Sequence, residues 1–488
     1  MNVRSSVLLL MLCCAAPAAG QTARVTVEAG RAVGPWKPAT GYFNTSLRKA
    51  PPPGLADQVK EQYGRARITR VWLPLDDMWD YRTGEYRFNF QCGKDYYAAD
   101  NVKHKYERDK TVESNVMFYD YMDAFSRNSD RLLLNVRRYE HEVTRGIIPI
   151  GKWKEVLKTG LRHYKQRYAN LSYIEVLNEA HVDHFGGLDD DRYYGFYRVA
   201  YQVVNELNLE LKPAVPLLVG GPSTVGTPMR AEDLKKPPSA KNRTQRMYRF
   251  LTNYAQDSDP GKRLDFLSFH DYGLASEPSR IATYDAMVRG WLKDMALPTE
   301  IPIFETEIGA AKVAPEGALN LRNAAGMSAF FYHTRHNPNY YLFPWVLYHN
   351  PVQLSVVQFD ERLRPTPSGA ALLAWSMHKE REVTVSWENQ PPGSYAVATA
   401  DGSGLAVQVW NFAEKAVEAD VVLNGAPARA VRMRRYVIDS RHSNCLQNQK
   451  AACALETVSD HKLAAAPKSV RVQLEPFALS LLRLDTEQ

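Results

Sequence analysis

Cysteine is scarce in this chain, with five residues among 488. Cys13 and Cys14 lie in an apolar N-terminal stretch, which leaves Cys92, Cys445 and Cys453 for the rest of the protein. No set of cysteines and histidines has metal-ligand spacing, so the sequence predicts no metal site. Cys445 and Cys453 are close together in a polar stretch and form the candidate disulfide, provided that the chain is exported. Cys92 is then left over, and we assign it no catalytic role.

Three further absences narrow the class of protein. No stretch beyond the N-terminus is long and apolar enough to span a bilayer, so no membrane span is predicted. No glycine-rich phosphate loop follows the first strand, which argues against a doubly wound nucleotide-binding sheet, and no cofactor is predicted. The net charge of +7 comes from interspersed charges rather than from a basic stripe with stacking aromatic residues. Nucleic-acid binding is therefore not predicted. The positive charges are interpreted as ordinary solvated surface groups, with binding of an acidic substrate as the second interpretation.

The first twenty residues have the pattern of an export signal. Arg4 gives a short basic start, residues 7–19 are apolar, and residues 16–20 supply the small side chains of a cleavage site. The apolar run is too short for a transmembrane anchor. The sequence thus predicts residues 1–20 as a signal peptide and a secreted or periplasmic protein.

Short apolar runs alternate with amphipathic stretches over most of the chain. The runs predict strands near residues 42, 70, 133, 175, 218, 267, 304 and 344, and the stretches between them predict helices. Alternating strands and helices indicate right-handed crossovers and a parallel sheet. Eight such strands predict an α/β fold, a closed (β/α)₈ TIM barrel, in residues 21–380.

The pattern changes after residue 380. Asp401-Gly402 lies between two alternating runs and predicts a hairpin, and further short strands follow to the C-terminus. Residues 381–488 are therefore predicted to form an antiparallel β-sandwich, with alternate faces packed on the barrel. Residues 24–29 also alternate, and this first strand pairs either with the barrel or with the sandwich.

Polar side chains follow three of the predicted barrel strands. Glu179 follows the fourth strand, His270 and Tyr272 follow the sixth, and Glu307 ends the seventh. All parallel strands of a barrel end at one face, so these side chains are expected to converge. Two carboxylates across a cleft are the groups that glycoside hydrolysis requires, one as a proton donor and one as an ionised nucleophile.

Each of these assignments has an alternative. Glu305 is a second candidate for the nucleophile, because residues two apart on a strand point the same way and both carboxylates would then face the lumen. Glu307 is favoured because it lies nearer the strand end. Trp345 is a candidate for stacking on a sugar face, with core packing as the alternative. Arg70 is a candidate partner of the nucleophile or a substrate contact, with a surface position as the alternative.

The strand-end motifs resemble those of the retaining (β/α)₈ glycosidases of clan A. The similarity is greatest to glycoside hydrolase family 39, which contains β-xylosidases and α-L-iduronidases. The motifs are residues 178–179 (Asn-Glu), 269–272 (Phe-His-Asp-Tyr) and 306–307 (Thr-Glu), and weaker similarities lie at 364–368 and 437–444. The chain departs from the family after both glutamates, where Ala and Ile replace the usual Pro and aromatic residue.

The resemblance implies roles for four residues. Glu179 is the general acid/base, Glu307 is the nucleophile, Asn178 bonds the sugar 2-hydroxyl, and Tyr272 orients Glu307. His270 is expected to contact a sugar hydroxyl because it lies beside Tyr272 at a strand end, with a satisfied core histidine as the alternative. The resulting prediction is a hydrolase of oligosaccharide or polysaccharide substrates, either xylosidase-like or acting on a bacterial exopolysaccharide. The alternative is a non-catalytic exported carbohydrate-binding protein on the same scaffold.

Overall fold

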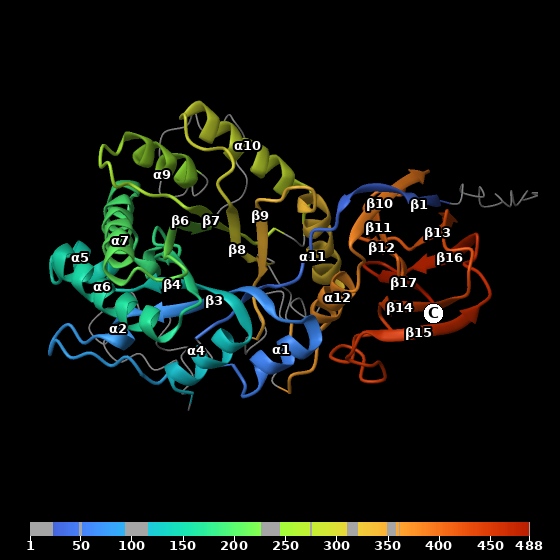
Figure 1. Ribbon diagram of the computed structural model, residues 1–488, viewed down its shortest axis with the longest axis horizontal. Helices are drawn as coiled ribbons and strands as arrows, with labels where there is room; N and C mark the ends of the chain where they lie inside the picture. The colour runs from blue at the N-terminus through green and yellow to red at the C-terminus, as the bar shows by residue number, and fades with distance from the viewer. Residues whose placement is uncertain are drawn as a thin grey trace, which may run out of the picture.

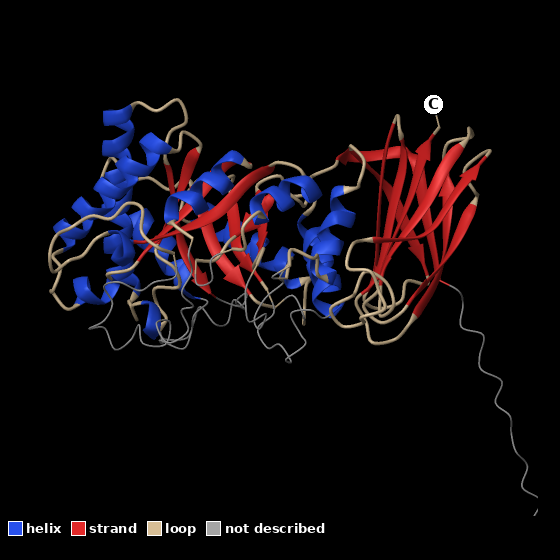
Figure 2. Ribbon diagram, turned by 90° about the horizontal axis from the view of Figure 1, so that it is seen from below, coloured by secondary structure: helices blue, strands red, loops and turns tan. Residues whose placement is uncertain are grey.

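The computed structural model of the protein describes residues 23–47, 51–92, 116–225, 245–273, 276–309, 321–348, 358–360 and 362–487. Two bodies lie side by side in it, a barrel of parallel strands within a ring of helices and a second body made of strands (Figures 1 and 2). The predicted signal peptide, residues 1–20, lies outside the described residues. Within the described part of the chain, no helix is both long enough and apolar enough to cross a membrane.

The barrel contains eight parallel strands that follow one another in chain order. Tyr42 of the first strand lies 5.0 Å from Tyr341 of the last, measured between ring centroids. The Leu347 N–H donates to the Asn44 carbonyl at 3.0 Å, so the two edges of the sheet approach each other. The predicted barrel and its eight strand positions are confirmed. The strands are β2 (Tyr42–Asn44), β3 (Ala66–Pro74), β4 (Ser129–Arg137), β5 (Leu171–Val176), β6 (Leu218–Val225), β7 (Phe266–Asp271), β8 (Ile303–Ile308) and β9 (Tyr340–Pro344).

Amphipathic helices cover the outside of the barrel. In α4 (Phe118–Arg127) the buried side chains are Phe118, Tyr121, Met122 and Phe125, a spacing that places them on one helical face. The other described helices are α1 (Leu55–Tyr63), α2 (Leu75–Met78), α5 (Glu140–Thr144), α6 (Ile150–Arg167), the 3₁₀ helix η2 (Asp183–Phe185), α7 (Asp190–Leu211), α9 (Gln245–Gln256), α10 (Arg280–Asp294), α11 (Leu321–Thr334) and α12 (Pro367–Ser376).

The barrel lumen is divided into two layers of different chemistry. Residues two apart on a strand share a face, and five of the strands contribute an apolar or aromatic lumen residue and then a polar one nearer the C-terminal end. The lower layer is the buried cluster Tyr42, Ile68, Leu133, Phe266, Phe304 and Phe343, with the partly buried Tyr173 packed against it. The upper layer, two positions further along five of the strands, is Asn44, Arg70, Asn135, Glu175 and Thr306, all completely buried.

The second body is a nine-stranded sheet in the order β15-β14-β17-β12-β11-β10-β1-β13-β16. All of its described pairings are antiparallel except that of β1 with β13. The N-terminal strand β1 lies among the C-terminal strands, seen in Figure 1 as blue beside orange and red. Its strands are β1 (Ala23–Pro35), β10 (Arg381–Glu388), β11 (Ser394–Asp401), β12 (Gly404–Asn411), β13 (Val417–Asn424), β14 (Val431–Ile438), β15 (Glu456–Leu463), β16 (Ser469–Leu474) and β17 (Leu479–Thr486).

Alternate faces of this sheet serve two cores. On β12, Ala406 and Trp410 join the core of the barrel and its helices, whereas Val407 and Val409 join the internal core of the second body. The Trp410 ring lies 5.8 Å from that of Trp375 on α12, which stands between the two bodies. Outside this interface, Cys445 and Cys453 form the expected disulfide, and Cys92 is free and buried.

Candidate active site

Glu179 lies at a tightly turned exit from β5. Leu177 and Glu179 have φ angles of 58° and 45°, a left-handed backbone conformation that residues other than glycine rarely adopt. The Glu179 N–H donates to the Ser223 carbonyl at 2.9 Å, which joins the end of β5 to that of β6. This turn places Asn178 and Glu179 at the lip of the lumen, above Glu175 on the same strand.

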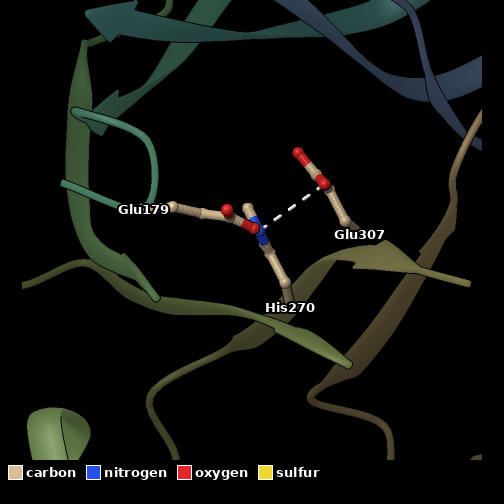
Figure 3. Close-up of side chains that lie close together, drawn as sticks. All are labelled: Glu179, His270 and Glu307. Atoms are coloured by element: carbon tan, nitrogen blue, oxygen red, sulfur yellow. Dashed lines mark hydrogen bonds and ion pairs between the residues drawn. The ribbon is translucent and has the colours of Figure 1, made fainter. Parts of the chain in front are cut away.

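His270 lies between the two predicted catalytic carboxylates (Figure 3). Its Nδ1 is 2.7 Å from Glu179 Oε1 and 3.5 Å from Glu307 Oε2, and its Nε2 is 3.2 Å from Ser223 Oγ. The side chain of Glu307 is 5% exposed, that of Glu179 is 14% exposed, and that of His270 is completely buried. The structure therefore brings together Glu179, His270 and Glu307 from three strand ends, as the sequence predicted.

Tyr272 and Arg70 hold the two oxygens of Glu307 from opposite sides. The Tyr272 hydroxyl donates to Oε2, and Arg70 Nη1 donates to Oε1 at 2.7 Å. Burial raises the pKa of Tyr272 well above its ordinary value, and the Glu307 and Glu179 charges raise it further. Tyr272 thus stays protonated and remains a donor. Arg70 Nη2 also donates to Asn178 Oδ1 at 3.0 Å, which leaves the amide nitrogen as the donor group of Asn178.

Glu175 is a buried carboxylate of the site that the sequence reasoning missed. Its Oε2 accepts hydrogen bonds from Arg70 Nε and Asn135 Nδ2, both at 2.7 Å, and its Oε1 accepts one from Thr306 Oγ1 at 2.7 Å. Burial raises the pKa of Glu175, but the Arg70 charge and these hydrogen bonds bring it below its usual value. The signal was present in the sequence, because a glutamate inside an apolar strand must have a buried partner.

Glu305, the alternative candidate for the nucleophile, does not share the lumen position of the favoured Glu307. The register of β7 and β8 shifts between Phe269, which pairs with Glu305, and His270, which pairs with Glu307. Such a bulge redirects the side chains after it. Glu305 accepts a hydrogen bond from Tyr340 Oη at 2.9 Å outside the lumen, and burial raises its pKa well above the usual value. Glu305 is therefore a buried core residue whose protonated form is favoured by burial.

The remaining candidates occupy different positions around the site. Asp271 is buried and pairs with Arg280 at the start of α10. Trp345 follows β9, and its ring meets the Trp72 ring edge-on with centroids 5.8 Å apart. The Arg70 guanidinium carbon lies 4.3 Å from the centroid of the Trp72 ring. Trp72 therefore packs between Trp345 and the arginine that bonds Glu307.

Glu179, His270 and Glu307 also have the ligand types of a cation site. One oxygen or nitrogen atom of each lies within 4.8 Å of the others. The sequence spacing did not reveal this group, because its members come from three strands. Both Glu307 oxygens already accept a hydrogen bond, from Arg70 and from Tyr272, so this carboxylate needs no cation for its satisfaction.

Comparison with solved structures places this arrangement on a known scaffold. The chain superposes on a monomeric β-xylosidase from Caulobacter crescentus CB15 with a TM-score of 0.67 and 15% identity, covering 95% of this chain and 99% of the other. The fold is that of family 39 glycoside hydrolases. A GH39 enzyme from Xanthomonas axonopodis pv. citri gives a TM-score of 0.64 and 14% identity, with 95% and 97% covered. A bacterial orthologue of human α-L-iduronidase gives 0.67 and 12%, with 96% and 84% covered.

The likeness is one of structure rather than sequence. No protein-family model and no curated protein sequence matches the chain. The family 39 resemblance inferred from the strand-end motifs agrees with these structural neighbours, and it extends over nearly the whole chain.

Proposed function

We propose that the protein is a retaining glycoside hydrolase in which Glu307 is the nucleophile and Glu179 the general acid/base. One observation carries this proposal: carboxylate oxygens of Glu179 and Glu307 lie within 4.8 Å of each other at the C-terminal ends of the barrel strands. Their surroundings differ, since Glu307 is held by Arg70 and Tyr272 while Glu179 is bonded to His270 and is the more exposed of the two. Different surroundings are what allow one carboxyl to donate a proton while the other attacks.

The reaction proceeds by double displacement. A Glu307 oxygen forms a bond to the anomeric carbon as the bond to the leaving oxygen breaks, and the Glu179 proton passes to that oxygen. Glu307 is then a neutral glycosyl ester. Water next attacks the anomeric carbon, Glu179 takes its proton, and Glu307 leaves as a carboxylate.

The carboxylate separation favours retention over inversion. Retaining enzymes hold the two carboxyl groups about 5–5.5 Å apart, whereas inverting enzymes hold them about 6.5–9.5 Å apart to admit a water. Oxygens of Glu179 and Glu307 lie within 4.8 Å of each other, which supports the shorter spacing of retaining enzymes.

The neighbouring residues take supporting roles in the proposal. The Asn178 amide nitrogen binds the sugar hydroxyl beside the anomeric carbon, and Trp345 borders the sugar ring. Arg70 and His270 were expected to contact substrate, but both are completely buried and bonded to carboxylates. We therefore assign Arg70 to Glu307 and His270 to Glu179, as groups that position the two carboxylates.

The proposed substrate is an oligosaccharide or polysaccharide, with a β-xyloside or a bacterial exopolysaccharide as its two candidate classes. Support for the first comes from the β-xylosidase among the structural neighbours. Support for the second comes from the departures after both glutamates, at Ala180 and Ile308, which lie beside the catalytic pair. We also propose export by the N-terminal signal, which places the enzyme in the periplasm or outside the cell.

The test is hydrolysis of a panel of aryl glycosides of both anomeric configurations, together with exopolysaccharide oligosaccharides. Proton NMR of the first product should show retained configuration. Glu307→Gln should lower kcat by about 10⁴-fold or more, a typical loss for a removed nucleophile. Glu179→Gln should keep turnover only of aryl glycosides with good leaving groups, and added azide should raise that turnover and give a glycosyl azide of retained configuration.

Glu305→Gln is the matched control, because it makes the same substitution on the same strand outside the lumen. It should retain activity. Loss of activity in Glu305→Gln but not in Glu307→Gln would contradict the assignment of the nucleophile. Binding of oligosaccharides without hydrolysis of any activated glycoside would instead show a carbohydrate-binding protein.

A further inference from the structure

Arg70 is shared between two carboxylates, although only one of them takes part in the proposed chemistry. Its side chain and that of Glu175 are completely buried, and Glu307 is nearly so. Arg70 Nη1 bonds Glu307 Oε1 at 2.7 Å, while Nε and Nη2 both lie 2.7 Å from Glu175 Oε2. The guanidinium thus binds Glu175 through two nitrogens and Glu307 through one.

The charge of this group changes during the proposed reaction. In the resting enzyme, Arg70 with Glu175 and Glu307 carries a net charge of about −1, taking each group in its ordinary ionised form. When Glu307 becomes an ester, its negative charge is lost and Arg70 no longer has it as an anionic partner. A buried guanidinium without a counterion is strongly unfavourable. Glu175 remains, and the Arg70–Glu175 pair is then neutral.

We propose that Glu175 is a positioning residue that acts through Arg70 and holds its counter-charge while Glu307 is esterified. Glu175 is suited to this role because it does not depend on Arg70 alone. Asn135 and Thr306 donate to it from the neighbouring upper-layer positions, so its carboxylate stays fixed when Glu307 changes. In the resting state Glu175 also balances Arg70, which leaves Glu307 with more of its negative charge for attack.

The first test uses no substrate. Glu307→Gln reproduces the neutral, esterified state of Glu307, and Glu175→Gln removes the proposed counter-charge. Each single variant leaves Arg70 one carboxylate, whereas the double variant leaves none. The fall in Tm of the double variant should exceed the sum of the single falls by about 5–10 °C, the effect expected for an unpaired buried charge. Additive losses would overturn the proposal.

Two controls keep this cycle interpretable. Glu305→Gln, a buried carboxamide substitution outside the lumen, should add to Glu307→Gln without coupling. If the double variant does not fold, Arg70→Met added to it should restore folding by removing the unpaired charge. Failure of Arg70→Met to restore folding would show that Glu175 supports packing rather than charge, which overturns the proposal.

The second test rests on the proposed function and uses an aryl glycoside that the unmodified enzyme hydrolyses. Glu175→Gln should slow formation of the glycosyl-enzyme by about 100-fold, because the step now creates an unpaired guanidinium. The burst of aryl alcohol should disappear and KM should rise, since the first step becomes rate-limiting. Glu305→Gln should keep the burst.

The pH dependence of kcat/KM in Glu175→Gln distinguishes two roles of Glu175, balancing the Arg70 charge or only holding the Arg70 side chain in place. The charged and titratable groups around Glu307 are Arg70 on β3, Glu179 after β5, and His270 and Tyr272 on and after β7. In Glu175→Gln, Glu307 faces the whole Arg70 charge, so the acid limb of kcat/KM should move to lower pH. If Glu175 only supports the Arg70 side chain sterically, the hydrogen bond between Arg70 and Glu307 should loosen in Glu175→Gln. The acid limb of kcat/KM would then stay where it is or move to higher pH, and this result would overturn the proposal. A chain that hydrolyses nothing refutes the proposed function, while the thermal cycle still decides the pairing.

Discussion

The lower and upper layers of the barrel lumen are built from the same strands, yet they have opposite chemistry. Tyr42, Ile68 and Leu133 in the lower layer are followed two residues later by Asn44, Arg70 and Asn135 in the upper layer. Rings fill the lower layer, with Phe304 stacked on Phe266 at 4.8 Å between centroids. Hydrogen-bonded polar and charged groups fill the upper layer. Both layers are buried, and they differ in what burial requires of their side chains.

The difference shows how a barrel holds charge at its mouth. Close packing in the lower layer fixes the spacing of the strands independently of any polar contact. The upper layer uses that fixed spacing to hold Glu175 and Glu307 on either side of Arg70, at 2.7 Å from each. A buried ion pair adds little stability by itself but is costly to break. Truncation in the lower layer is therefore expected to lower stability more than activity, and loss of a single hydrogen bond to the catalytic carboxylates to lower activity more than stability.

Truncation of the lower layer should have the largest effect on stability. Phe304 is 1% exposed and has the rings of Phe266, Tyr173 and Tyr341 within 5.3 Å of its own. Phe304→Ala should lower the free energy of unfolding by about 3–5 kcal/mol through lost contacts and a cavity. Urea titration measures this loss. Activity per folded molecule should change less than tenfold, since no upper-layer contact is removed.

Phe304→Leu is the conservative partner of that variant. It keeps most of the volume and should lower the free energy of unfolding by about 1.5 kcal/mol or less. Equal losses in the two variants would mean that the ring stacking, rather than the filled volume, stabilises the lower layer.

Removal of the Tyr272 hydroxyl, which bonds Glu307, should lower activity more than it lowers stability. Tyr272→Phe deletes the donor to Glu307 Oε2 and keeps the ring. The rate constant kcat/KM should fall by about 10–100-fold, as expected for a hydrogen bond of about 1.5–3 kcal/mol to a charged group. Tyr340→Phe deletes the hydroxyl that donates to Glu305 outside the lumen. It should leave kcat/KM unchanged, and an equal fall in both variants would contradict the division between lumen and core.

The strand positions and the two glutamates were predictable because each depends on local pattern. Apolar runs mark buried parallel strands, and Glu179 and Glu307 follow or end such runs, so barrel topology alone brings them together. The bulges between strands were not predictable, since they depend on pairing with a neighbour. Glu305 points out of the lumen by ordinary strand alternation, and the extra residue of β8 between Glu305 and Glu307 turns Glu307 into the lumen.

The hydrogen-bond partners within the upper layer could not be predicted from the sequence pattern either. Glu175 lies 105 residues from Arg70 and 131 residues from Thr306. Nothing in a single strand indicates which buried donor will meet a buried carboxylate. The sequence could show only that such a partner exists. The same limit applies to β1, whose alternating pattern fits either body and whose partners β10 and β13 lie at the other end of the chain.

The two buried glutamates, Glu305 outside the lumen and Glu175 inside it, should differ in the sign of their effect on the pH dependence of stability. Burial, and then Asp271, raise the pKa of Glu305 well above its ordinary value of 4.5. The folded protein keeps this proton while the unfolded chain releases it, so stability falls as the pH rises above 4.5. Glu305→Gln should remove a slope of about 1.4 kcal/mol per pH unit from the free energy of unfolding. Activity should be unaffected, and some slope should persist, because burial raises the pKa of Asp271 as well.

Glu175 should give the opposite sign. Its folded pKa lies below 4.5, so the stability that its charge provides is present above that pH and is lost as the pH falls through the folded value. Denaturant titrations from about pH 7 to below pH 4 therefore distinguish the two residues, because the Glu305 slope lies above pH 4.5 and the Glu175 slope lies below it. If Glu305→Gln left the slope unchanged, Glu305 would be ionised in the folded protein, and a second buried charge would lie directly behind the catalytic strand.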